Sequence, residues 1–189
     1  MTQIPGAARP TLVVGRGASD AGGAASLAAE RLRAAWGLAP SPAPVHGAAP
    51  GAEAALAARL AAEPGTRVLL LLAQSGRASH RSELPLRVDP LAGGDSAVLL
   101  VTVPAYAAQA PQPAAAVRLI EAAERLIGSP VLDRGLYDDA EAWRRGADEL
   151  LLHDPRVASL VRVWERLQPS GQPSGEEIAD GFARLLGRT

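Results

Sequence analysis

The sequence predicts a layered α/β fold followed by a C-terminal helical segment. The runs "RVLLLLA" (67–73) and "AVLLVTV" (97–103) are continuously apolar, as expected of strands covered on both faces. A shorter apolar run at 11–15 precedes a glycine-rich turn. From residue 114 onward the apolar residues recur at helical spacing instead. Together these patterns predict a short, mostly parallel sheet with helices packed on it.

The N-terminal half alternates strands and helices. We expect a strand at 11–15, and then a helix that Ser19 or Asp20 caps and that runs to about Trp36. A loop at 37–51, with a candidate short strand near Val45, leads to a helix at 52–62. The strand at 67–73 follows, and residues 74–96 are expected to be irregular before the last strand.

The C-terminal half is predicted to be helical. Apolar residues line one face of helices at 114–127 and 138–152. Asp154 followed by Pro155 is a strong start signal for the next helix. A linker at 168–175 precedes a last helix, whose start carries a capping-box pattern at Ser174 and Glu177. We therefore divide the chain into an α/β core (1–104), a helical segment packing on it (105–168), and a linker with a C-terminal helix (169–189).

Composition excludes several classes of function. The 189-residue chain has a net charge of −1, so no overall field attracts nucleic acid or an anionic membrane. It has no cysteine, which excludes thiolate catalysis and cysteine metal sites. All 19 basic residues are arginine, which excludes Schiff-base chemistry and a phosphate-loop lysine. With no apolar run of membrane length and no signal-peptide pattern, we expect a cytoplasmic protein.

The stretch "GRGASDAGG" (15–23) is the one that most resembles a nucleotide-binding loop. The dinucleotide fingerprint needs a third glycine where this chain has Asp20. A carboxylate at that place would repel a pyrophosphate at the helix N-terminus. We therefore interpret the stretch as a strand-to-helix turn in which Asp20 caps the helix, and we expect no cofactor.

No stretch predicts a catalytic or metal site. None of the histidines His46, His80 and His153 has another histidine or a carboxylate at metal-binding spacing within a predicted helix. The segment "SGRASHRSE" (75–83) offers serines, His80 and Glu83, but neighbours in sequence do not make a triad, which is assembled in space. We interpret this segment as a solvated loop, with anion binding by "RASHR" as the alternative.

Four segments in the same order resemble the proteasome assembly chaperone 2 family, in the form found in high-GC actinobacteria. These are a Gly-x-x-Asp-Ala-Gly turn (17–22), a Val-Pro-x-Tyr segment (103–106), an acidic helix ending in Asp-Pro (141–155), and a Pro-Ser-Gly helix (173–186). The resemblance covers about 110 residues. It implies a phosphorylase-like α/β sandwich with an added helical segment, in a non-enzymatic protein that forms homo-oligomers and assists proteasome assembly.

The chain departs from this family at two places. Residues 37–100 look shortened, and "SHRSELPLRV" is only faintly similar to the family's Pro-His-Thr-Arg-Pro stretch. The chain also ends Gly-Arg-Thr, whereas some family members dock on the proteasome with a hydrophobic–Tyr–any tail.

A rival resemblance leads to an alternative function. "VVGRGASD" is similar to the opening of sirohydrochlorin-type cobaltochelatases, in which His46 and His80 would have to bind the metal. We favour the chaperone family, with a protein partner, proteasome subunits among the candidates, and no bound metal. The candidate partner-surface residues are aromatic: Tyr106, Trp143, Trp164 and Phe182.

Overall fold

A four-stranded mixed sheet forms the centre of the molecule. In the computed structural model, which describes residues 10–15, 17–38, 52–63, 65–91 and 96–166, the strands are β1 (Pro10–Val14), β2 (Arg67–Gly76), β3 (Leu86–Pro90) and β4 (Ala97–Pro104). Their order is β1-β2-β4-β3. β2 runs parallel to both β1 and β4, and only β3 is antiparallel. The predicted layered α/β fold with a mostly parallel sheet is confirmed.

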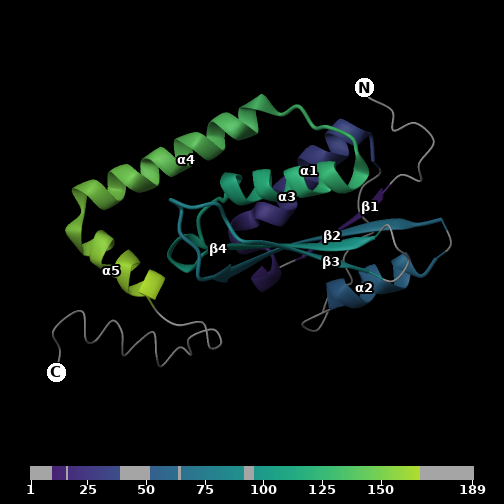
Figure 1. Cartoon of the computed structure of the whole chain (residues 1–189), viewed down its shortest axis with the longest axis horizontal. Coiled ribbons are helices and arrows are strands. Elements are labelled where there is room, and N and C mark those ends of the chain that lie inside the picture. The colour runs from purple at the N-terminus through teal and green to yellow at the C-terminus, as the bar shows by residue number, and fades with distance from the viewer. Residues whose placement is uncertain (1–9, 16, 39–51, 64, 92–95, 167–189) are drawn as a thin grey trace.

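Helices cover both faces of the sheet (Figure 1). Helices α1 (Ala24–Trp36) and α3 (Pro113–Ile127) pack side by side on one face, where most of the core lies. Helix α2 (Ala52–Ala61) packs on the other face, over a smaller cluster around Leu70. The central strand β2 is therefore buried from both sides, which explains its continuous apolar run.

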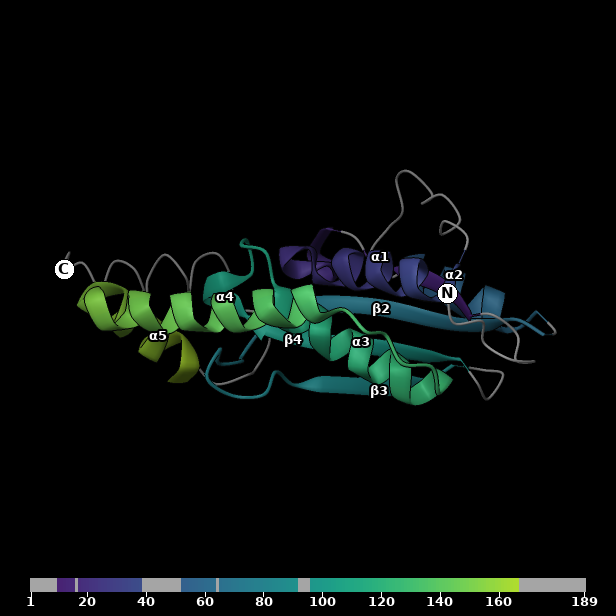
Figure 2. The same cartoon turned by 90° about the horizontal axis from the view of Figure 1, so that it is seen from above.

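The last two described helices form a projecting hairpin. Helix α4 (Arg134–His153) packs on α3 through its first turns, and only Leu136 and Ala140 of α4 are buried. Its remaining length extends past the end of the sheet, and α5 (Pro155–Arg166) turns back from it (Figures 1 and 2). As predicted, Asp154 caps α5: its Oδ1 accepts hydrogen bonds from the amides of Arg156 and Val157 at 2.9 and 3.3 Å.

The glycine-rich turn is tight because two short 3₁₀ turns, Gly17–Ser19 and Ala21–Gly23, precede α1. The helix thus begins at Ala24, three or four residues later than a cap at Asp20 or Ser19 predicts. Asp20 still provides the cap. Its Oδ1 accepts from the amides of Ala25 and Ser26 at 2.7 and 3.3 Å, and its Oδ2 accepts from the Ser26 hydroxyl at 2.5 Å. The carboxylate thus occupies the amides that a bound phosphate would need.

Two other predictions about elements need correction. Residues 74–96 are not irregular throughout, because β2 continues to Gly76 and β3 forms the sheet edge at Leu86–Pro90. The charged residues and the proline of β3 do not match the apolar pattern of a buried strand. Such residues are common on edge strands, because they discourage pairing with another chain. Helix α4 begins at Arg134 rather than at 138, since Asp133 caps it through a bond from the Leu136 amide.

The remaining predictions about elements lie outside the described residues. They are the candidate strand near Val45, the linker at 168–175 and the last helix with its capping box. The division into parts at 104 and 168 stays a prediction. No helix in the described part of the chain has the length and apolar character needed to cross a membrane.

Candidate interaction site

The candidate site lies at the carboxyl ends of β2 and β4. These two strands are parallel neighbours, so the segments that follow them emerge at the same edge of the sheet. The segment after β2 carries His80, and a 3₁₀ turn directly after β4 (Ala105–Ala107) carries Tyr106. Residues 26 positions apart in sequence are thereby brought into contact.

His80 is buried, with 2% of its surface exposed, and its backbone amide and both ring nitrogens have partners. Its backbone amide donates to the Tyr106 hydroxyl at 3.1 Å, and its Nδ1 lies 2.8 Å from the same oxygen. Its Nε2 lies 3.2 Å from Oδ1 of Asp148 on α4. These contacts are all satisfied when Nδ1 accepts from the tyrosine hydroxyl and Nε2–H donates to the carboxylate. His80 therefore links the C-terminal part of α4 to the end of the sheet where β2 and β4 stop.

Two aromatic rings pack edge-on against the imidazole. The Tyr106 ring is 6.1 Å away at an interplanar angle of 88°, and the Trp143 ring is 6.4 Å away at 85°. Such T-shaped pairs contribute roughly 0.5–1.5 kcal/mol each beyond the area they bury. The packing and the hydrogen bonds together position α4 relative to β4.

Asp148 is shared between two donors. Arg81 Nε donates to its Oδ1 at 2.8 Å, and the His80 ring contacts the same oxygen. The hydrogen bonds from Arg81 and then from His80 lower the pKa of Asp148 below its ordinary value of 3.8. The carboxylate consequently stays ionised under all physiological conditions.

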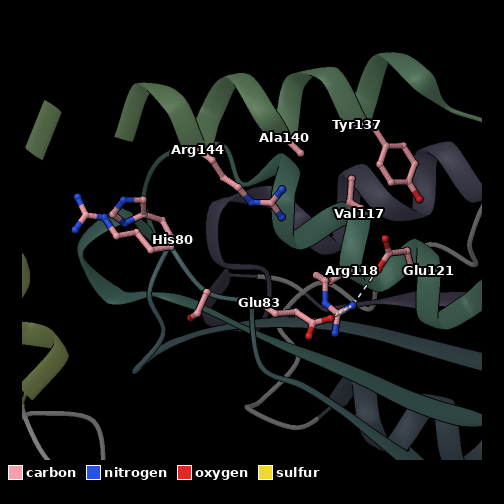
Figure 3. A pocket seen from close by; sticks show the side chains of 10 residues that line it. His80, Glu83, Val117, Arg118, Glu121, Tyr137, Ala140 and Arg144 are labelled. Atoms are coloured by element: carbon pink, nitrogen blue, oxygen red, sulfur yellow. Dashed lines mark hydrogen bonds and ion pairs between the residues drawn. The ribbon is translucent and has the colours of Figure 1, made fainter. Parts of the chain in front are cut away.

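A pocket of about 370 Å³, lined by both charged and apolar side chains, lies beside His80 (Figure 3). Its walls come from the segment 80–83 and from helices α3 and α4. Arg118 crosses its base, where one guanidinium nitrogen, Nη1, donates to Glu83 at 2.7 Å and to Glu121 at 3.0 Å. Arg144 extends into the pocket from α4. The pocket also borders Tyr137, whose pKa is raised by burial and then by the charges of Glu121 and Glu124.

The structure brings two of the four predicted partner-surface residues together. Tyr106 and Trp143 both contact His80, and both are half-buried. The side chain of Trp164 and the whole of Phe182 lie outside the described residues. A role for any of the four in partner binding stays a prediction.

The prediction of a solvated loop at 75–83 is wrong at its centre, because His80 is buried there. The anion-binding alternative for this stretch is also weakened, since Arg81 is paired with Asp148. The partners of His80 come from positions 106 and 148 rather than from the serines or Glu83 nearby. The sequence carries one signal for this contact, which is that Tyr106 follows a buried strand closely. Parallel strands end at a common edge of the sheet, so the segments that follow them can meet there.

The metal-binding alternative receives no support from the described residues. Within them, no group of three or more histidine, cysteine or acidic side chains could hold a metal ion. Both ring nitrogens of His80 contact other side chains, and His46 lies outside the described part. The expectation of no bound metal stays a prediction.

Part of the chain matches a known protein family. Residues 88–151, from within β3 to near the end of α4, match the model of the PAC2 family. No functionally curated protein matches the chain.

Several solved actinobacterial structures share the fold. A Mycobacterium tuberculosis proteasome-assembly chaperone homologue is 18% identical with a TM-score of 0.58, over 81% of this chain and 100% of that one. A PAC2 family protein from Streptomyces avermitilis is 21% identical with a TM-score of 0.54, over 75% and 96% of the two chains. A Mycobacterium tuberculosis protein of unknown function is 18% identical with a TM-score of 0.60, over 94% and 85%. The predicted resemblance to the PAC2 family, the proteasome assembly chaperone family, is confirmed.

Proposed function

We propose that this protein is a non-enzymatic, protein-binding assembly chaperone of the cytoplasm that forms homo-oligomers and assists proteasome assembly. The relationship to the PAC2 family supports a chaperone-like role at the level of the family. Proteasome subunits are the proposed partners, by analogy with the proteasome-assembly chaperone homologue that shares the fold.

The observation that carries the proposal is the apolar end of the α4–α5 hairpin. Three successive leucines, 150–152, occupy a wide arc of α4 near its C-terminus. Leu150 is 54% exposed and Leu152 is 78% exposed, on different sides of the helix. Exposed apolar side chains that lie together in this way are typical of a surface that contacts another protein.

A second chain would complete the burial of these leucines. Fully burying one leucine side chain stabilises a complex by roughly 1.5–3 kcal/mol relative to leaving it exposed. The hairpin projects beyond the sheet, so another chain can reach it from more than one side (Figure 2). We therefore place the interface between copies on this hairpin.

Sedimentation of matched leucine variants tests this interface. Leu152→Arg should shift the chain toward monomer, because it places a charge in the shared apolar surface. The control is Leu132→Arg, since Leu132 is 97% exposed in the connection between α3 and α4, far along α4 from the hairpin end. The control should sediment as the wild type does. A wild type that is monomeric at tens of micromolar would overturn the proposed oligomer.

A further inference from the structure

The pocket between the segment 80–83, α3 and α4 contains an arginine with no ion-pair partner among the described residues. Arg144 is half-buried, lines the pocket, and has no hydrogen bond or ion pair within the described part of the chain. The nearest carboxylates on α4 contact other side chains. Asp148, four residues on, binds Arg81 and His80, and Glu141, three residues back, lies 3.9 Å from Arg145. The guanidinium of Arg144 is thus available to a ligand.

Two carboxylates lie on the opposite side of the pocket. Glu83 and Glu121 both pair with Arg118, so among the described residues they share one ion-pair partner. Figure 3 shows Arg144 reaching down from α4, with Glu83, Arg118 and Glu121 across the pocket from it. The lining therefore presents a positive side and a negative side, and a simple anion would be repelled by the second of these.

The pocket is also open to solvent at its mouth. The Glu83 side chain is 72% exposed and the Arg81 side chain is 61% exposed. Sites for small molecules usually enclose 70–90% or more of their ligand, which an open, charged cleft does not do. Side chains offered by another protein are a better fit, because the rest of that protein excludes water from above.

We propose that this pocket binds a peptide segment of a partner protein that carries a carboxylate next to an ammonium group. The carboxylate accepts hydrogen bonds from Arg144, and the ammonium group lies toward Glu83 and Glu121. The buried side chains of Val117 and Ala140 provide apolar contact for the aliphatic parts of the segment. The assignment rests on the proposed protein-binding function and specifies the chemistry of the partner.

The test uses three capped dipeptides as probes: acetyl-Glu-Lys-amide, acetyl-Gln-Lys-amide and acetyl-Glu-Gln-amide. Each is titrated into the isotope-labelled full chain, and nuclear magnetic resonance follows the arginine Nε–H and backbone amide signals. We expect saturable shifts at residues lining the pocket, with acetyl-Glu-Lys-amide binding tightest. Equal affinity for all three probes, or no saturable shift, would overturn the proposal.

Variants then identify the groups responsible. Arg144→Gln should weaken acetyl-Glu-Lys-amide about tenfold, the change expected on losing one hydrogen bond to a charged group. Glu121→Gln should remove the preference for lysine. The matched control is Arg145→Gln, because Arg145 is adjacent on α4, 68% exposed and absent from the pocket lining. Equal weakening by Arg145→Gln would contradict the assignment.

The probe comparison needs no variant, so it remains informative even if Arg144→Gln unfolds. It also differs from the sedimentation test, which depends on the leucines of the hairpin and uses no peptide. If acetyl-Glu-Lys-amide fails to bind while Leu152→Arg still disrupts the oligomer, only the pocket assignment is wrong. If the wild type is monomeric but binds the probe selectively, the oligomer is wrong and the pocket stands.

Discussion

Replacing Asp20 by alanine should destabilise the protein by removing the cap of α1. The mutation removes the acceptor for the amides of Ala25 and Ser26 and for the Ser26 hydroxyl. Loss of a helix cap costs about 0.5–2 kcal/mol. Ala25 is fully buried, so water replaces the lost acceptor poorly, and a buried unsatisfied donor costs about 1–3 kcal/mol. We therefore expect a loss of about 1–2 kcal/mol in the free energy of unfolding.

Thermal unfolding followed by circular dichroism measures this loss. For a chain of this size, 1 kcal/mol corresponds to about 2–4 °C, so the Tm should fall by about 2–8 °C. Asp20→Asn keeps a side-chain oxygen and should lose less. Asp139→Ala, at an exposed position on α4, is the control and should stay within about 0.5 kcal/mol of the wild type. If Asp20→Ala melts with this control, the capping argument is refuted.

The other predictions concern two glycines, acid stability and nucleotides. Gly15→Ala should lower the Tm, because the added Cβ would lie 2.4 Å from the Ser19 carbonyl oxygen. Gly146→Ala should raise the free energy of unfolding by up to about 1 kcal/mol, because a Cβ there meets nothing within 4 Å and alanine favours the helix more than glycine does. The Arg81–Asp148 contact stabilises the fold fully above the ordinary carboxyl pKa, and this stabilisation is lost as the pH falls through the lowered pKa of Asp148. Asp148→Asn should therefore make the stability depend less on pH below about pH 4. An unchanged dependence at acid pH would argue against this role of Asp148. Calorimetry should find no ATP or NAD binding tighter than about 100 μM, because the Asp20 carboxylate already occupies the helix amides, and a tighter complex would refute that interpretation.

The strands and helices with strong local signals were predictable from the sequence. The apolar runs of β2 and β4 and the Asp-Pro start of α5 lie where the patterns indicated. The edge strand β3 was not predictable, since it is stabilised by pairing with β4 rather than by its own residues. Elements with an apolar run or a capping residue in their own sequence can thus be predicted from that sequence, whereas an element stabilised by pairing with another strand cannot.

The contacts of His80 could not be predicted because they depend on tertiary structure. Its partners lie 26 and 68 residues away in sequence, on two other elements. The polar pocket has the same origin, since Glu83 and Arg118 meet only when α3 packs beside the segment that follows β2. The position of Arg144 in the pocket has the same origin, because the side chain that lies four residues on along α4, Asp148, contacts Arg81 and His80 from the segment after β2.

Affinity capture from the native cell tests the proposed chaperone function most directly. The wild type and Leu152→Arg are tagged, crosslinked in the cell and captured under identical conditions, and mass spectrometry quantifies the proteins bound to each. We expect proteasome α-subunits to be enriched with the wild type. Leu152→Arg should capture fewer untagged copies of this chain, because it disrupts the proposed interface between copies. Absence of every proteasome subunit from the wild-type capture, with the bait expressed and folded, would contradict it.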